Sequence, residues 1–198
     1  MGKLYEAIDG RIQAFIEAQH MFFVATAPLG GGGHVNLSPK GLDTFRVLGP
    51  LEVAYLDYVG SGAETIAHLR ENGRITIMFC AFEGPPNIVR LYGRARVVEP
   101  GDRGFKALRR RFPSGHDARA VVRVAVDRVT DSCGYGVPRY ALEGDRSQLF
   151  AWADHKGTDG LRDYQTEKNA RSIDGLPALR WVTPNREPRS ARRLSSGE

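Results

Sequence analysis

The hydrophobic pattern of the chain changes its period once, near residue 20. In residues 3–19 apolar side chains recur every three or four positions, which predicts an amphipathic helix. Beyond residue 20 the period falls to two, in short runs rich in β-branched and aromatic residues and separated by Gly and Pro. These runs are MFFVATA, HVNLSP, LEVAYLDY, RITIMFCAF, IVRLYGRARVV and AVVRVAVDRV, with TFRVL as a further short candidate.

Six or seven strands with few helices between them favour a mainly β (α+β) fold. A doubly wound parallel sheet would need a crossover helix between successive strands, so we expect a mostly antiparallel barrel with peripheral helices. One short helix is expected after Gly62, and a basic one near Phe105. A C-terminal helical extension is predicted over residues 158–176, and residues 1–184 as a whole are expected to form a single domain.

The net charge of +5 raises the question of a nucleic-acid partner. Part of this charge lies in residues 185–198, which carry four Arg and two Glu with one large apolar residue and are expected to form a disordered basic tail. The RGFKALRRRF cluster carries five cations, but Phe105, Leu108 and Phe112 have the spacing of a buried helical stripe. A helix with a solvated basic face explains this cluster better, so we do not expect nucleic acid as a partner.

Other classes of protein find little support in the sequence. No run of about 18 apolar residues occurs and the N-terminus lacks a signal-peptide block, so we expect a cytoplasmic protein without a membrane partner. Cys80 and Cys133 match no zinc or CxxC spacing, and the five His form no metal-ligand pair. No catalytic triad, GxSxG or P-loop motif is present, and the catalytic residues stay unknown. Such a chain suits chemistry that a cofactor carries.

Two strands combine an apolar face with a polar, largely cationic one. Alternation places the following residues on these polar faces: His34, Asn36, Ser38 and Lys40 in the first, and Arg90, Tyr92, Arg94 and Arg96 in the second. An ordinary solvated surface predicts the same alternation and is the better explanation of these strands alone. The absence of interleaved acidic residues is, however, what an anionic ligand would require.

The GSGAET stretch after YLDY has two interpretations. Ser61 and Glu64 match a capping box, which explains the turn without any ligand. Gly60 and Gly62 equally let the backbone approach a phosphate at a helix N-terminus, although Glu64 opposes an anion. The stretch does not complete GxGxxG. Taken alone, the capping interpretation is the stronger.

Several stretches together resemble the pyridoxamine 5′-phosphate oxidase-like flavoproteins, the FMN-binding split-barrel family. They are VNLSPKG, VAYLDYVGSGAETIAHLRENGRITIMFCAF, IVRLYGRARVVEP, SCGYGVP and KNARSIDGLPAL. Their order and spacing carry the resemblance, and SPKG, CGYGVP and SIDGLP resemble a branch other than the vitamin B6 oxidase itself. The resemblance implies a six-stranded antiparallel split β-barrel that forms a homodimer and binds FMN in grooves between the subunits.

The resemblance also implies cofactor-binding residues in four places. One strand would lie along the flavin ring and ribityl chain, the following turn would meet the phosphate, a further strand would supply charge, and a segment near the flavin edge would come from the other subunit. In that order, the residues are Asn36, Leu37, Ser38 and Lys40; Ser61, Gly62 and Thr65; Arg90; and Cys133, Gly134 and Tyr135.

Two departures from the vitamin B6 oxidase shape the functional prediction. The Arg-Lys pair that grips the FMN phosphate there is replaced by Ser-Gly-Ala-Glu, and some relatives bind a deazaflavin or haem instead. The substrate-phosphate motif is also absent, so we do not expect pyridoxamine phosphate oxidation. We predict an FMN-dependent oxidoreductase that transfers hydride between flavin N5 and an unidentified small molecule. The alternative is a non-catalytic flavin, deazaflavin or haem-binding module.

Overall fold

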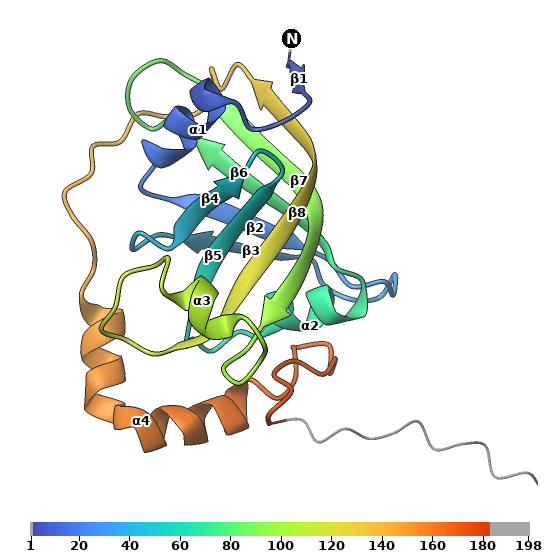
Figure 1. The fold of residues 1–198 in the computed structure, drawn as a ribbon, viewed down its shortest axis with the longest axis vertical. Helices are drawn as coiled ribbons and strands as arrows, with labels where there is room; N and C mark the ends of the chain where they lie inside the picture. The colour runs from blue at the N-terminus through green and yellow to red at the C-terminus, as the bar shows by residue number, and fades with distance from the viewer. Residues whose placement is uncertain (1, 183–198) are drawn as a thin grey trace, which may run out of the picture.

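The computed structural model describes residues 2–182, which form an antiparallel eight-stranded sheet with four helices around it (Figure 1). The strands pair in the order β3-β2-β6-β7-β8-β5-β4, and β1 pairs with β8 outside this path. Their bounds are β1 Leu4–Tyr5, β2 Phe22–Thr26, β3 Asn36–Lys40, β4 Phe45–Gly49, β5 Glu52–Tyr58, β6 Arg74–Cys80, β7 Ile88–Val98 and β8 Ala118–Ser132.

The mainly β, antiparallel fold predicted from the sequence is confirmed. Each of the six longer apolar runs overlaps a strand, and TFRVL overlaps β4. The count exceeds the expected six because β4 and the two-residue β1 both join the sheet. β1 is held to β8 by Asp131, whose carboxylate accepts hydrogen bonds from the Lys3 backbone N–H at 2.8 Å and from the Tyr5 hydroxyl at 2.5 Å.

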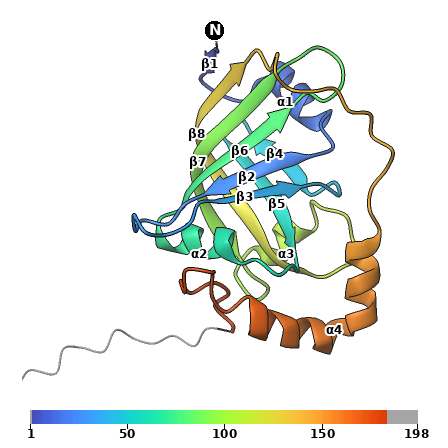
Figure 2. The ribbon, with the colours of Figure 1, turned by 180° about the vertical axis from the view of Figure 1, so that it is seen from behind.

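The sheet curls into a barrel that stays open along one line. β3 and β4 lie at the two ends of the pairing order and are not paired with each other. Figure 2 shows α1 at one end of the curled sheet and α2 and α3 at the opposite end, with α4 beyond them. This arrangement agrees with the split barrel that the resemblance implies.

Helix α1 (Gly10–Glu17) closes one end of the barrel and is shorter than the predicted helix over residues 3–19. It begins where Asp9 accepts a hydrogen bond from the Ile12 backbone N–H at 2.8 Å, because such a cap fixes the first turn. Ile12 and Ile16 are buried in the barrel interior. Four aromatic rings pack edge to face or tilted beside them: Phe22, Phe45, Tyr55 and Phe79.

Helices α2 (Glu64–Glu71) and α3 (Phe105–Arg109) lie at the other end of the barrel. The predicted basic helix is therefore only five residues long. Its apolar stripe packs against a cluster on β5 and β8 through Phe105, Leu108 and the following Phe112. The apolar spacing in this basic stretch thus reflects packing against the barrel.

Helix α4 (Gln148–Lys168) corrects the prediction of a helix over residues 158–176. The prediction began the helix at residue 158, whereas α4 begins at Gln148. Gly157 breaks the helix locally, with φ 63° and ψ 176°, and helical turns lie on both sides. The helix ends at Lys168, and residues 169–180, the C-terminal segment, pack on α2 through Ala178 and Leu179. Within the described range, no helix has the length and apolar character to cross a membrane. The predicted tail of residues 185–198 lies outside that range.

Candidate functional site

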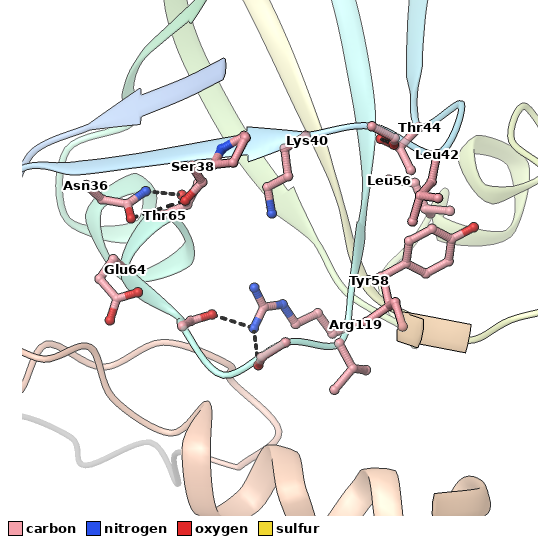
Figure 3. A pocket seen from close by; sticks show the side chains of 16 residues that line it. Asn36, Ser38, Lys40, Leu42, Thr44, Leu56, Tyr58, Glu64, Thr65 and Arg119 are labelled. Atoms are coloured by element: carbon pink, nitrogen blue, oxygen red, sulfur yellow. Dashed lines mark hydrogen bonds between the residues drawn. The ribbon is translucent and has the colours of Figure 1, made fainter. Parts of the chain in front are cut away.

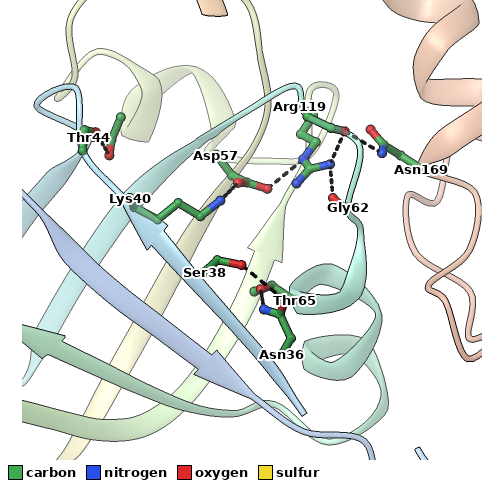
Figure 4. Close-up of polar contacts among 11 residues, drawn as sticks. Asn36, Ser38, Lys40, Thr44, Asp57, Gly62, Thr65, Arg119 and Asn169 are labelled. Carbon is green, nitrogen blue, oxygen red and sulfur yellow. Dashed lines mark hydrogen bonds and ion pairs between the residues drawn. The ribbon is translucent and has the colours of Figure 1, made fainter. Parts of the chain in front are cut away.

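A buried carboxylate with two cationic partners lies across the open line of the barrel. Asp57 on β5 is 1% exposed and accepts a hydrogen bond from Lys40 Nζ on β3 at 2.7 Å. Its other oxygen accepts from Arg119 Nε on β8 at 2.8 Å (Figure 4). The Arg119 side chain is 5% exposed, whereas that of Lys40 is 23% exposed. The three side chains therefore form a triad in which Lys40 is the member open to solvent.

A β-bulge turns Arg119 toward this triad. Asp57 pairs with Ala120 and Tyr58 pairs with Ala118, so Arg119 is the extra residue between the two pairs. Such a bulge interrupts the alternation of a strand and redirects one side chain. Arg119 is therefore buried between Ala118 and Ala120, in a stretch of β8 that is buried as far as Val122.

The triad sets the protonation of Asp57. Burial raises the pKa of this carboxyl. The positive charges of Arg119 and Lys40, together with their hydrogen bonds, outweigh the effect of burial and lower the pKa to about 2. The carboxylate is consequently charged at neutral pH, and the triad carries a net charge of +1.

We expect this depressed pKa to contribute to acid sensitivity. A carboxyl with a folded pKa of about 2 and an ordinary value of 3.8 stabilises the folded state fully above pH 3.8. Its contribution, about 2 kcal/mol, is lost as the pH falls from 3.8 through 2. The free energy of unfolding of the wild type, measured between pH 2 and 5, should therefore fall more steeply than that of Asp57→Asn. Equal slopes in that window would contradict the assignment.

The turn before α2 is held by Arg119 and not by the predicted capping box. Arg119 Nη1 donates to the carbonyl oxygens of Gly60, at 3.2 Å, and Gly62, at 2.7 Å. The prediction that Ser61 caps α2 is wrong, because the N-cap is Ala63 and no side chain in residues 2–182 caps the helix. Glu64, the first residue of α2, instead accepts a hydrogen bond from the Ile173 backbone N–H at 3.3 Å.

A chain of polar side chains leads from β3 to the first turn of α2. Ser38 Oγ donates to Asn36 Oδ1 at 3.3 Å, and Asn36 Nδ2 donates to Thr65 Oγ1 at 2.9 Å (Figure 3). Alternation along β3 puts Asn36, Ser38 and Lys40 on one face, as predicted, and this face points toward the turn.

These groups surround a cavity of about 380 Å³. Its lining includes Asn36, Ser38, Lys40, Gly62, Thr65 and Arg119. A second cavity of about 1,090 Å³ is lined mainly by apolar side chains, and its lining includes Phe82, Tyr140 and Leu142. The two cavities share residues 39–42 and Leu149, so a ligand in the polar cavity can extend into the apolar one.

Five of the eleven predicted cofactor-binding residues thus come together, and the other six lie outside the polar cavity. Leu37 is on the opposite, exposed face of β3, and Ser61 is not part of the lining. Arg90 Nη1 donates to Ser132 Oγ at 3.0 Å. Cys133 and Tyr135 are exposed, and Gly134 between them adopts φ 65°. The contribution of residues 133–135 across a subunit interface stays a prediction.

Sequence reasoning missed Asp57 and Arg119. Asp57 is a single acidic residue in the apolar run VAYLDY, and Arg119 immediately precedes the apolar run AVV. A charged residue on the buried face of a strand is rare unless it is paired, and this rarity was the available signal. Their pairing depends on a bulge, which the alternation pattern does not reveal.

The fold and this site define a split-barrel protein with an anion-compatible pocket, and comparisons with known proteins identify its family. The model of the pyridoxamine 5′-phosphate oxidase family matches residues 8–133. The pyridoxamine 5′-phosphate oxidase family protein ustO of Aspergillus flavus is 41% identical over 192 residues, covering 88% of this chain and 77% of the relative. The chain belongs to the pyridoxamine 5′-phosphate oxidase family.

Solved structures of lower identity are also similar to this chain. A crystal structure of HupZ from Group A Streptococcus has a TM-score of 0.50 and 23% identity, and it covers 63% of this chain and 99% of its own. A FAD-binding protein from Mesorhizobium loti has a TM-score of 0.45 and 13% identity, and the match covers 66% of this chain and 96% of that protein. The HupZ comparison supports the fold alone.

Proposed function

We propose that this protein binds FMN with the phosphate at the start of α2 and acts as an FMN-dependent oxidoreductase. The observation that carries the proposal is the polar cavity, where Lys40, Arg119 and the first turn of α2 converge. Arg119 uses Nε and Nη1 for its hydrogen bonds with the described residues, which leaves Nη2 for a ligand. A helix N-terminus beside two cations is suited to a phosphate monoester.

The donor set fits this group in kind. Two cations face one buried carboxylate, so the triad has a net charge of +1. Glu64 also lines the cavity and offsets this charge, and the Ile173 backbone N–H binds one of its carboxylate oxygens, Oε1. Ser38, Asn36 and Thr65 supply hydrogen-bonding groups of the kind that hold a ribityl chain. This set replaces the Arg-Lys pair of the vitamin B6 oxidase.

Bound FMN would supply hydride transfer at its N5 atom, and the chain would supply binding and orientation. The apolar cavity beyond residues 39–42 offers space for the ring and a small substrate and would exclude water from them. Lys40 lines both cavities and would stabilise negative charge near the ring or the phosphate. We further propose a homodimer with the cofactor at the subunit interface, in which residues 133–135 approach the flavin of the other subunit.

A flavin-binding module without turnover is the second candidate. Among the described residues, the titratable side chains that line the polar cavity are Lys40, Tyr58, Glu64 and Arg119, and none is a His or Cys that could donate or accept a proton near neutral pH. A carrier needs no such group. Anaerobic reduction separates the two, because an oxidoreductase passes electrons between its flavin and a small molecule whereas a carrier does not.

We expect the purified protein to bind FMN at least about tenfold more tightly than riboflavin. Riboflavin lacks the phosphate, and charge-assisted hydrogen bonds contribute about 1.5–3 kcal/mol each. Quenching of flavin fluorescence on titration with protein measures both affinities, and an absorption spectrum with mass spectrometry identifies any copurified cofactor. Equal affinities would contradict the phosphate site. A haem or deazaflavin spectrum would retain the family and replace the proposed chemistry.

A further inference from the structure

Asn169, the first residue after α4, reaches the turn before α2 from the side of the C-terminal segment. Its side chain is completely buried. Nδ2 donates to the carbonyl oxygens of Gly60 at 2.9 Å and Ser61 at 3.3 Å (Figure 4). The backbone of Asn169 is fixed as well, because its N–H donates to Gln165 and its carbonyl accepts from Leu179. The amide is therefore held rigidly against the turn.

Asn169 and Arg119 together bind every carbonyl of the turn. Arg119 Nη1 donates to Gly60 and Gly62, and Asn169 donates to Gly60 and Ser61. Because the C=O and N–H of one trans peptide unit point in opposite directions, fixing these carbonyls also fixes the N–H groups of residues 61–63. Within the described part of the chain these N–H groups have no hydrogen-bond acceptor, so they are available to an anion.

The orientation of the Asn169 amide is determined by the turn. Its Oδ1 is buried and has no hydrogen-bond partner among the described residues. Reversing the amide would place this oxygen against two carbonyl oxygens, which would repel it. A buried acceptor without a partner costs stability, and such costs are tolerated where a neighbouring contact is required. The required contact here is the donation to Gly60 and Ser61.

The C-terminal segment also affects the charge beside the turn. The Ile173 backbone N–H donates to the Glu64 carboxylate at 3.3 Å. Figure 3 shows the Glu64 side chain on the side of α2 that faces this segment. This contact restrains the one acidic side chain in the cavity lining that would repel a phosphate. Asn169 and Ile173 both lie beyond residues 8–133, the part that matches the family model.

We propose that Asn169 is a positioning residue for the anion site, which holds the Gly60–Gly62 turn in its phosphate-binding form from the C-terminal segment. This proposal rests on the proposed function. It adds a structural requirement that lies outside residues 8–133, the part of this chain that the family model matches. It predicts that the turn loses affinity for a phosphate when the amide is removed, while the remainder of the flavin site is retained.

The test replaces Asn169 with Leu, which has a similar size but no hydrogen-bonding group. Asn169→Leu should bind FMN about tenfold more weakly than the wild type, while its affinity for riboflavin changes less than twofold. A purely structural defect would lower both affinities alike. Arg180→Ala is the matched control, since it removes the ion pairs of the same segment with Asp102 and Glu99 without touching the turn. Its FMN affinity should remain within twofold of the wild type.

Backbone NMR relaxation separates this proposal from the proposed function. In the flavin-free protein, the order parameters of the amides of residues 61–63 should stay near about 0.85 in the wild type and Arg180→Ala and fall below about 0.6 in Asn169→Leu. Unchanged order parameters in Asn169→Leu, or unchanged FMN affinity in a wild type that binds FMN, would overturn the positioning role. If the wild type binds no FMN, the cofactor proposal falls, and the order parameters alone decide whether Asn169 holds the turn.

Discussion

Replacing Arg119 with Met is expected to destabilise the protein by about 3–5 kcal/mol and to abolish FMN binding. Removing one partner of a buried ion pair leaves an uncompensated charge, and Asp57 would retain only the partly exposed Lys40. The carbonyl of Gly62 would also lose its donor, and that of Gly60 would keep only Asn169. Urea denaturation followed by tryptophan fluorescence measures the free energy of unfolding, and flavin titration measures the affinity.

Arg123→Met is the matched control for Arg119→Met on the same strand. Arg123 pairs with Glu52, and their side chains are 53% and 35% exposed. Exposed pairs of this kind contribute about 1 kcal/mol or less, so Arg123→Met should leave both stability and FMN affinity nearly unchanged. A similar loss of stability in both variants would show that the buried triad has no special role.

A double variant tests whether the unpaired charge of Asp57 causes the loss. Asp57→Asn combined with Arg119→Met removes the charge together with its partner, so the double variant should be more stable than the sum of the two single losses predicts. FMN binding should not return, because the phosphate would still lack Arg119. Strict additivity of the stability losses would argue against coupling within the triad.

The strands could be predicted because alternation is a local property of the sequence. The run RITIMFCAF contains β6, and the run IVRLYGRARVV contains the neighbouring strand β7. The apolar side chains of both strands that point into the barrel belong to its hydrophobic core. Helix ends were less predictable where one residue decides them. Asp9 starts α1, and Gly157 breaks α4 without ending it.

The site could be predicted only in part, since its strongest contacts join distant residues. The face of β3 with Asn36, Ser38 and Lys40 followed from alternation. The pairing of Asp57 with Arg119 spans 62 residues and depends on a bulge, and that of Asn169 with Gly60 spans 109 residues. The charge inside the apolar run VAYLDY marked Asp57 as unusual, but no local pattern in a single sequence identifies the partner in either contact.

Lys40→Met is expected to separate cofactor binding from stability. Lys40 is the solvent-accessible member of the triad, and Arg119 would still neutralise Asp57, so the free energy of unfolding should fall by about 1.5–3 kcal/mol, the contribution of one charge-assisted hydrogen bond and less than in Arg119→Met. FMN affinity should fall about 10–100-fold, because one charge-assisted contact of about 1.5–3 kcal/mol is lost and the triad becomes neutral. The affinity for riboflavin should change much less.

The charge itself needs a control, because removing any cation weakens the attraction of an anion at long range. Lys106→Met removes the same charge from the exposed face of α3, outside both cavities, and should change FMN affinity less than twofold in 0.15 M salt, where the screening length is about 8 Å. If Lys106→Met weakens FMN as much as Lys40→Met does, the effect is that of net charge, and Lys40 has no direct contact with the cofactor. If only Lys40→Met weakens FMN, and riboflavin binding persists, Lys40 acts on the phosphate. Loss of both ligands in Lys40→Met would instead assign Lys40 to the flavin ring, where the two cavities meet.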